Sequence, residues 1–294
     1  MVLGASGLIF IAMENSQEQV KQSPIIYLRP SKGWLSIDFK ELWRYRELIF
    51  FLTWRDIKVR YKQAVLGITW AILQPLLTTL IFTVIFGILL KTPSQDLPYP
   101  LFTMTALLPW QLFSTALQRS SVSLVGNANL ITKIYFPRLA IPLSSVFAAL
   151  VDFAVSFVVL LLVMAYYQYW PGWTIVWLIP IVLLALLTAL AVGLWLSALN
   201  VQYRDIQHMV PFLIQVWMYA SPIVYPIETI PDGIWRWLYG LNPMVGVIQG
   251  FRWALLGGNP PDITMLISII VVLVLLISGL YYFRRMEKTF ADIV

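Results

Sequence analysis

Long blocks of apolar residues alternate with short polar segments along most of this chain. A bilayer core of about 30 Å requires about 20 mostly apolar helical residues. Six blocks approach that length: residues 66–90, 101–117, 140–164, 175–199, 209–225 and 263–283. The second block is the weakest, because Gln111 lies inside it. Since backbone polar groups within lipid must be hydrogen-bonded inside the protein, we expect an all-α membrane protein with six transmembrane helices.

The segment before the first block, residues 38–62, mixes apolar and cationic positions. Its apolar residues recur at spacings of three, four or seven: Phe39, Leu42, Trp43, Phe50, Trp54, Ile57 and Tyr61. Most Lys and Arg of the segment fall elsewhere around the helix, which predicts an amphipathic helix, broken once, in the inner membrane interface. Gly67 lies near its turn into the first span. Two interpretations stay open, a polybasic anchor that binds anionic lipid and a cytosolic gate that meets an anionic headgroup.

Between the second and third blocks, residues 127–138 predict a short cytoplasmic helix. Asn127 or Asn129 can cap this helix, and Pro137 ends it. We expect its apolar residues to be exposed: Ile131, Ile134, Tyr135 and Phe136. Exposed apolar residues in such a helix either dock on a partner or fold back on the membrane.

Six prolines interrupt the chain between residues 221 and 262. The apolar stretch 242–258 is too short to span a bilayer. We expect two re-entrant half-helices over about residues 226–260, shielded by protein or by a water-filled cavity. The aromatic stretches 166–173 and 235–240 are typical of the outer membrane interface.

Asp152 is the one acidic residue well inside an apolar block. Twelve residues separate it from Ala140, which predicts a depth of about 18 Å, near the midplane. An intramembrane acid is a functional candidate, but a lone acid also serves to bond a neighbouring helix. Gln74 and Pro75 predict a kink in the first span, whose freed carbonyls are bonded locally.

The distribution of cations predicts the orientation. Of the 20 Lys and Arg, 17 fall on the side that holds both termini and 3 on the other, so both termini are expected in the cytoplasm. The chain is 60% hydrophobic and 12% charged, against about 50% and about 25% in soluble domains. We expect tails at residues 1–36 and 285–294, interfacial helices at 37–63 and a six-helix domain at 64–284 of a multi-pass protein in the cytoplasmic (inner) membrane. The first residues fit a signal peptide poorly, and Met13 is an alternative start.

The composition excludes several classes of chemistry. With one histidine and no cysteine, the chain is expected to hold no metal site and no hydrolytic triad. It contains no P-loop motif and no paired membrane carboxylates for ion coupling. The net charge of +6 lies beside the apolar blocks, which favours membrane lipids over nucleic acid as partners. We therefore expect no cofactor in this chain, and an energy source on a partner that docks on the cytoplasmic loops.

Six stretches in order carry a family resemblance: RDIKVRYKQAVLGITWAILQPLL, LLPWQLFS, ITKIYFPRLAIP, YRDIQH, YASPIVYP and LNPMVGVIQGFRWALLG. Together, over about residues 38–290, they resemble the membrane subunit of type-2 ABC exporters that move lipid-linked polysaccharides, such as O-antigen and capsule or teichoic-acid precursors. The resemblance implies a non-enzymatic permease that forms a homodimer, with two P-loop ATPase subunits that bind ATP and Mg. It also implies a lipid-linked glycan substrate and a channel at the dimer interface.

The resemblance implies roles for individual residues. Residues 127–138 resemble the coupling helix that contacts the ATPase, with candidates Asn129, Ile131, Lys133, Tyr135 and Arg138. The cytosolic gate near a pyrophosphate-linked headgroup has the candidates Arg55, Lys58, Arg60 and Lys62. Candidates for channel-lining aromatics are Trp70, Trp110, Phe113, Tyr167, Trp217, Tyr219 and Tyr225. The alternatives are export of a small drug or lipid by the same scaffold, an ion-coupled secondary transporter that uses Asp152, and a membrane-embedded enzyme, which the lack of a catalytic set disfavours.

Overall fold

The described part of the chain, residues 39–62, 67–94, 96–231, 233–258 and 260–290 of a computed structural model, is built from helices and short connections. The longer helices are α3 (Arg46–Lys62), α4 (Gly67–Phe82), α5 (Tyr99–Gly126), α7 (Ala140–Tyr166), α8 (Leu178–Gln202), α9 (Ile206–Tyr219), α11 (Pro243–Leu256) and α12 (Ile263–Glu287). The shorter elements are α2 (Phe39–Arg44), α6 (Ala128–Lys133), α10 (Ile234–Gly240), the π-helix η1 (Thr83–Leu89) and the 3-10 helices η2 (Trp173–Trp177) and η3 (Ile227–Thr229). These residues contain no strand, which confirms the all-α prediction over the described ranges. The predicted tail at 1–36 lies outside them.

Within the described residues, four helical stretches are long and apolar enough to cross a membrane: Thr69–Leu89, Ala140–Tyr166, Trp173–Gln202 and Ile263–Glu287. They coincide with the first, third, fourth and sixth predicted spans. At the second predicted span, α5 is longer than expected, with 28 residues or about 42 Å, and carries polar residues along its length. At the fifth, α9 has 14 residues. The crossing of the membrane by α5 and α9 therefore stays a prediction.

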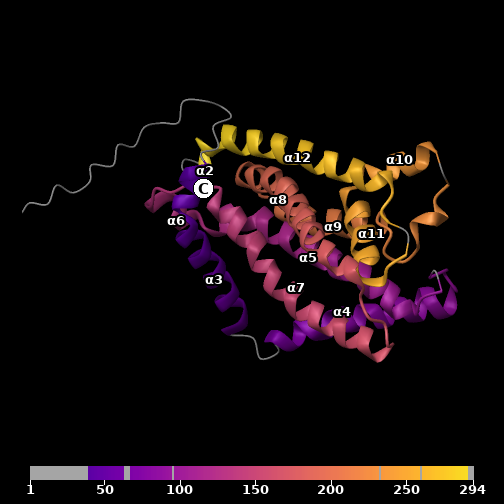
Figure 1. The fold of residues 1–294 in the computed structure, drawn as a ribbon. Coiled ribbons are helices and arrows are strands. Elements are labelled where there is room, and N and C mark those ends of the chain that lie inside the picture. The colour runs from indigo at the N-terminus through magenta and orange to yellow at the C-terminus, as the bar shows by residue number, and fades with distance from the viewer. Residues whose placement is uncertain (1–38, 63–66, 95, 232, 259, 291–294) are drawn as a thin grey trace, which may run out of the picture. The chain divides into compact units, whose positions relative to one another are not determined.

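Helix α5 lies between α7 and α8 and makes its most extensive contacts with these two helices (Figure 1). Small residues allow helices within a membrane to approach closely, and two glycines of the described core illustrate this. A Cβ on Gly193 of α8 would lie 2.5 Å from Ser120 Oγ of α5. A Cβ on Gly279 of α12 would lie 2.7 Å from the Ala191 carbonyl oxygen of α8. Helices α5, α8 and α12 are therefore packed as one close unit.

Helix α4 is the peripheral member of the group, since only 11% of its membrane window is buried. The helix continues through Pro75, which has no N–H and leaves the carbonyl of Ala71 without its usual donor. Ser156 Oγ of α7 donates to this carbonyl oxygen at 3.2 Å. The freed carbonyl is thus bonded by a neighbouring helix, whereas local bonding was expected.

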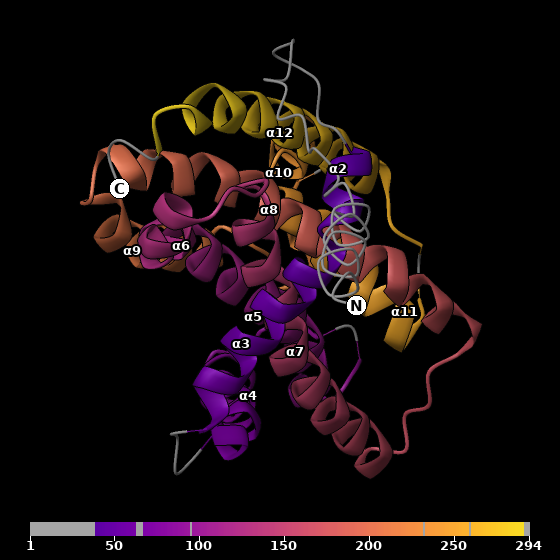
Figure 2. The ribbon, with the colours of Figure 1, turned by 90° about the vertical axis from the view of Figure 1, so that its left-hand side faces the viewer.

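A second apolar cluster joins α3, the end of α5, the segment from α6 to the start of α7, the last turns of α8, and the end of α12. Its buried members include Leu52, Ile131, Phe136, Phe283 and Phe290. The rings of Phe283 and Phe290 pack edge to face with centroids 5.3 Å apart. The N-terminal arm is broken once, at Tyr45 between α2 and α3, as its pattern indicated. Figure 2 shows α3 beside α7, with α4 following α3 along the same side.

Candidate functional site

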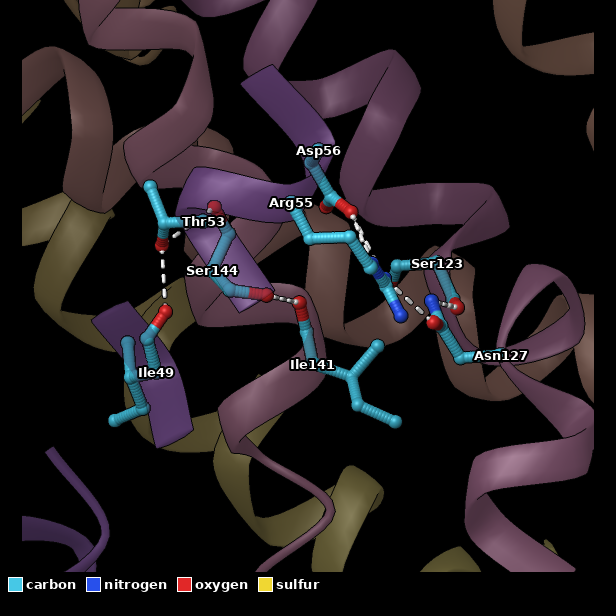
Figure 3. A network of polar contacts seen from close by, with 8 residues as sticks. All are labelled: Ile49, Thr53, Arg55, Asp56, Ser123, Asn127, Ile141 and Ser144. Atoms are coloured by element: carbon cyan, nitrogen blue, oxygen red, sulfur yellow. Dashed lines mark hydrogen bonds and ion pairs between the residues drawn. The ribbon is translucent and has the colours of Figure 1, made fainter. Parts of the chain in front are cut away.

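Helix α3 follows the first half of α7 in the same chain direction. Near the start of α7, Thr53 Oγ1 donates to the Ser144 carbonyl oxygen at 3.4 Å, in addition to its own-helix bond to Ile49 (Figure 3). Two turns further on, Arg60 and Tyr61 both donate to Asp152. The two contacts are seven to eight residues apart on α3 and eight residues apart on α7. Helix α3 is therefore anchored to α7 at two points about 12 Å apart.

Asp152 is the centre of a charged cluster that joins α3, α5 and α7. Its Oδ2 accepts from Arg60 Nη1 and, at 2.8 Å, from Arg119 Nη2, while its Oδ1 accepts from the Tyr61 hydroxyl. The side chains of Asp152, Arg119 and Arg60 are 17%, 25% and 40% exposed. Two guanidinium groups and one carboxylate leave one excess positive charge. The carboxylate therefore bonds neighbouring helices, which was one of the two interpretations left open by the sequence.

Tyr61 is a neutral hydrogen-bond donor in this cluster. Burial, followed by the hydrogen bond to Asp152, raises the pKa of Tyr61 to about 12. Because the phenol keeps its proton at physiological pH, the hydroxyl group always donates to the carboxylate.

A second polar network connects α3 to the junction of α5 and α6 (Figure 3). Arg55 Nη2 donates to Asp56 Oδ1 at 2.8 Å and to Asn127 Oδ1 at 2.7 Å. Asn127 Nδ2 in turn donates to the Ser123 carbonyl oxygen at 2.8 Å. Asn127 occupies the N-cap position of α6, but its side chain makes no capping bond. The predicted cap is therefore wrong for Asn127, because its side chain is engaged by Arg55.

The short helix expected at 127–138 is present as α6, which ends at Lys133, before Pro137. Exposure of its apolar residues was predicted correctly for Ile134 and Tyr135 and incorrectly for Ile131 and Phe136. The latter two are buried because they pack into the second apolar cluster.

The remaining coupling candidates also divide into exposed residues and one residue that is held by another helix. Asn129 and Lys133 are exposed, beside Tyr135. Arg138 is tied to the end of α12: its backbone N–H donates to Glu287 Oε1 at 3.3 Å and its guanidinium to the Glu287 carbonyl oxygen. The segment that follows α6 is thus fixed to α12, while α6 keeps an exposed surface.

Among the four gate candidates, Arg55 and Arg60 are engaged as described above. Lys58 and Lys62 are exposed and make no hydrogen bond or ion pair with a described residue. They add positive charge at the end of α3 that adjoins Asp152.

The seven candidate channel aromatics fall into three groups, which are buried, exposed and partly buried. Trp110 and Phe113 are buried, and Phe113 packs edge to face on Trp217 with centroids 4.9 Å apart. Trp70, Tyr167 and Tyr219 are exposed. Tyr225 is partly buried, and its hydroxyl lies 2.7 Å from that of Tyr239.

Asn242 is a structural residue that was not among those expected from the sequence. Its Oδ1 accepts from the Met244 backbone N–H, capping α11, and from Trp217 Nε1 at 2.8 Å. Its Nδ2 donates to the Ala220 carbonyl oxygen and to Ser221 Oγ, both at 3.0 Å. An Asn before a Pro at the first helical position is a recognisable helix start. The cross-helix bonds to α9 have no signature in sequence. Arg119 was not expected at the site either, because the sequence indicated it only as one of the 17 cations on the cytoplasmic side.

Over the described ranges, no group of three or more His, Asp or Glu side chains could hold a metal ion. The site described above presents cations, hydrogen-bond donors and apolar surface.

Comparison with known proteins gives consistent matches. Residues 47–256 match the family described as ABC-2 type transporter. The chain is 35% identical over 254 residues to the O-antigen export system permease protein RfbA of Myxococcus xanthus, covering 84% of this chain and 96% of that protein. It is 30% identical over 249 residues to RfbA of Klebsiella pneumoniae, covering 84% and 95%. It is 27% identical over 240 residues to the polysialic acid transport protein KpsM of Escherichia coli, covering 80% and 91%.

Proposed function

Because this chain belongs to the ABC-2 type transporter family, we propose that it is the permease of an exporter for O-antigen-like polysaccharide. The observation that carries the proposal is a match to polysaccharide export permeases over nearly their whole length, 96% for one and 91% for another. In this proposal the substrate is a lipid-linked glycan. A homodimer of the chain forms the channel, and two copies of a separate P-loop ATPase bind ATP and Mg and supply the energy.

The proposed topology has six spans, with α5 and α9 added to the four apolar stretches, both termini in the cytoplasm, and α10 and α11 as re-entrant half-helices. Arg119 lies 20 residues from Tyr99, the first residue of α5, which is about 30 Å along the helix and equals the thickness of the hydrocarbon core. The inner boundary then lies at the Asp152 cluster. In this proposal Asp152 lies near the inner interface, and not at the midplane depth that was predicted from its distance to Ala140.

The two polar networks of α3 support a route for the power stroke. The ATPase is proposed to bind the exposed surface formed by Asn129 and Lys133 of α6 and by Ile134 and Tyr135, which follow it. Because Arg55 bonds Asn127 at the start of α6, a shift of α6 either displaces α3 or breaks that bond. At its other end α3 is held by Asp152, so opening of the gate requires Arg60 and Tyr61 to leave this carboxylate.

The exposed aromatics are the better candidates for the channel wall. Trp70 of α4 and Tyr219 of α9 are open to contact with a second copy or with the glycan. Trp110 and Phe113 are buried within one protomer, and in the proposal they support Trp217, on which Phe113 packs. The alternative of an ion-coupled transporter that uses Asp152 is less well supported, because two Arg and one Tyr already bond its carboxylate.

The proposal is tested by co-expressing the permease with its ATPase in cells that lack their own O-antigen exporter. Surface polysaccharide should appear only with both chains and with an active ATPase. Tyr135→Ala should reduce copurification of the ATPase, while Tyr166→Ala, at an exposed tyrosine at the opposite end of α7, should not. Export by the permease alone, or tags on both ends that react from outside the cell, would contradict the proposal.

A further inference from the structure

The chain between α9 and α10 is not helical over residues 220–225, a stretch referred to below as the α9–α10 segment. Its middle packs into the main apolar core, where Ile223 is only 1% exposed. Backbone carbonyls that lie outside a helix and away from water need donors from elsewhere in the protein. Three carbonyl oxygens of this segment have such donors, and each donor is a side chain.

The three donors come from α5 and from the two ends of α11. Arg252 Nη2 donates to the Ile223 carbonyl oxygen at 2.7 Å, and the Tyr99 hydroxyl donates to the Val224 carbonyl oxygen at 2.8 Å. The third donor is the Asn242 amide, which bonds the first carbonyl of the segment at 3.0 Å. The α9–α10 segment is therefore held in place by side chains, which can release it without unwinding a helix.

Arg252 is the charged member of this set, and it is also braced on α5. Its Nε donates to the Phe102 carbonyl oxygen at 3.3 Å, and its guanidinium carbon lies 3.6 Å from the centroid of the Phe102 ring. No acid among the described residues forms an ion pair with Arg252, and its Nη1 makes no hydrogen bond to any of them. Arg252 thus joins α11, α5 and the α9–α10 segment at one point.

The position of Arg252 makes its charge costly. Phe102 lies three residues from the start of α5 at Tyr99, which is about 4.5 Å along the helix. In the proposed topology the guanidinium is therefore just inside the outer boundary of the membrane. A neutral donor would serve the same carbonyl oxygens at lower cost, and a charged residue retained within a membrane segment is a functional candidate.

We propose that Arg252 is the latch of the glycan exit: it holds the α9–α10 segment against α5 in the closed permease and releases it during export. The inference rests on the proposed function and adds to it a residue that positions the exit. Helices α5, α8 and α12 are closely packed through Gly193 and Gly279, so they are expected to stay together. Only Val210 of α9 is buried, so the bonds at the α9–α10 segment are expected to decide whether α9 can move away from α5.

Release of the segment would also move α10. The Tyr225 hydroxyl, at the end of the segment, lies 2.7 Å from the Tyr239 hydroxyl of α10. Since this contact connects the segment to α10, a displacement that begins at Arg252 is passed on to α10.

The test uses the full permease–ATPase complex in spheroplasts of cells that make the lipid-linked glycan, with a membrane-impermeant maleimide as the probe. Because the sequence has no cysteine, Ile223→Cys provides one buried thiol on the segment, and Val247→Cys, at a position of α11 that is 0% exposed, provides the control thiol. Arg252→Met removes the latch. Its matched control is Gln249→Met on the same helix, which loses the bond from Thr264 of α12 and leaves the bonds of the segment in place.

With an ATPase that cannot hydrolyse ATP, Ile223→Cys should label slowly, and an active ATPase should accelerate the labelling. Arg252→Met should label about tenfold faster even with the inactive ATPase, as loss of a charged hydrogen bond predicts, and Arg252→Lys should restore part of the slow rate. Tyr99→Phe loses only the neutral bond to the segment and should accelerate labelling by about fivefold. Gln249→Met should not change the rate, and Val247→Cys should label slowly throughout.

Equal labelling of Ile223→Cys in Arg252→Met and Gln249→Met would overturn the proposal. So would equal rates with the active and the inactive ATPase when Arg252 is present. Faster labelling of Val247→Cys in Arg252→Met would also overturn it, because Arg252 would then serve folding alone. Surface polysaccharide without the expected labelling contradicts the latch, whereas the expected labelling without surface polysaccharide contradicts the proposed export function.

Discussion

The Asp152 cluster gives the sharpest prediction, because one substitution removes the charge that holds three helices. In Asp152→Asn, Tyr61 keeps an acceptor but both arginines lose their ionic partner. The pair with Arg60 is 40% exposed on the arginine side and contributes about 0.5 kcal/mol, as surface pairs do. The bond to Arg119 is more enclosed, with 25% and 17% exposure, but Arg119 belongs to α5, so this bond joins α5 to α7 and does not hold α3. Loss of about 0.5 kcal/mol shifts the docked-to-released ratio of α3 by about twofold.

The absence of cysteine from the sequence provides the assay. Leu52 of α3 is only 2% exposed, so a thiol introduced by Leu52→Cys reacts with a maleimide mainly when α3 is released. In this background Asp152→Asn should accelerate labelling by about twofold, and Asp152→Glu should restore part of the slow rate. The matched control is Asp262→Asn, which changes an acid that caps α12 and pairs with Arg236 at 3.5 Å.

The reasoning fails if Asp152→Asn and Asp262→Asn label at the same rate while both proteins keep the melting temperature of the parent. In that case the ion pairs contribute nothing to the docking of α3, and the apolar contacts around Leu52 hold the helix by themselves.

Three further predictions follow from single contacts. Ser156→Ala leaves the Ala71 carbonyl without a donor and should cost about 1–2 kcal/mol; in a double-mutant cycle, Pro75→Ala should recover most of this loss because residue 75 regains its N–H. Asn242→Ala should lower the melting temperature more than Asn242→Asp, which keeps the acceptor for the cap and costs about 1 kcal/mol less. The folded-state pKa of Tyr61 is raised from 10.0 to about 12, so the contribution of Tyr61 to stability is complete below pH 10 and is lost as pH rises through 12. An ultraviolet difference titration between wild type and Tyr61→Phe measures the pKa of Tyr61. A pKa near 10 would contradict the prediction.

Much of the helical framework was predictable because hydrophobic blocks of bilayer length leave few alternatives. The short helix α6 and the pair of helices before α12 were also indicated, by the prolines beside them. The boundaries of α5 were not predictable, because Gln111 and Arg119 interrupt its run of apolar residues. Neighbouring helices, rather than lipid, surround α5. Burial inside a bundle removes the requirement for an unbroken apolar surface.

The candidate site was predictable in its parts but not in its connections. Asp152 and Arg60 were both singled out, but only packing brings residues 92 positions apart to one point. The same holds for Ile131 and Phe136, whose apolar character predicted exposure on a coupling surface and whose actual position is a core formed by five separated segments. Pairings of this kind depend on how helices cross, which single-sequence periodicity does not report.

The bond between Ser156 and Ala71 has a consequence for biogenesis. The carbonyl exposed by Pro75 belongs to the earliest-synthesised of the four apolar stretches, and its donor is encoded 85 residues later. At about 5–20 residues per second, the ribosome requires about 4–17 s to deliver Ser156. During that interval the nascent helix presents an unsatisfied oxygen to hydrocarbon or must remain beside the translocon. Insertion of α4 is therefore expected to be completed only when α7 has been synthesised. Because of Pro75, α4 is expected to need a chaperone or the translocon until then.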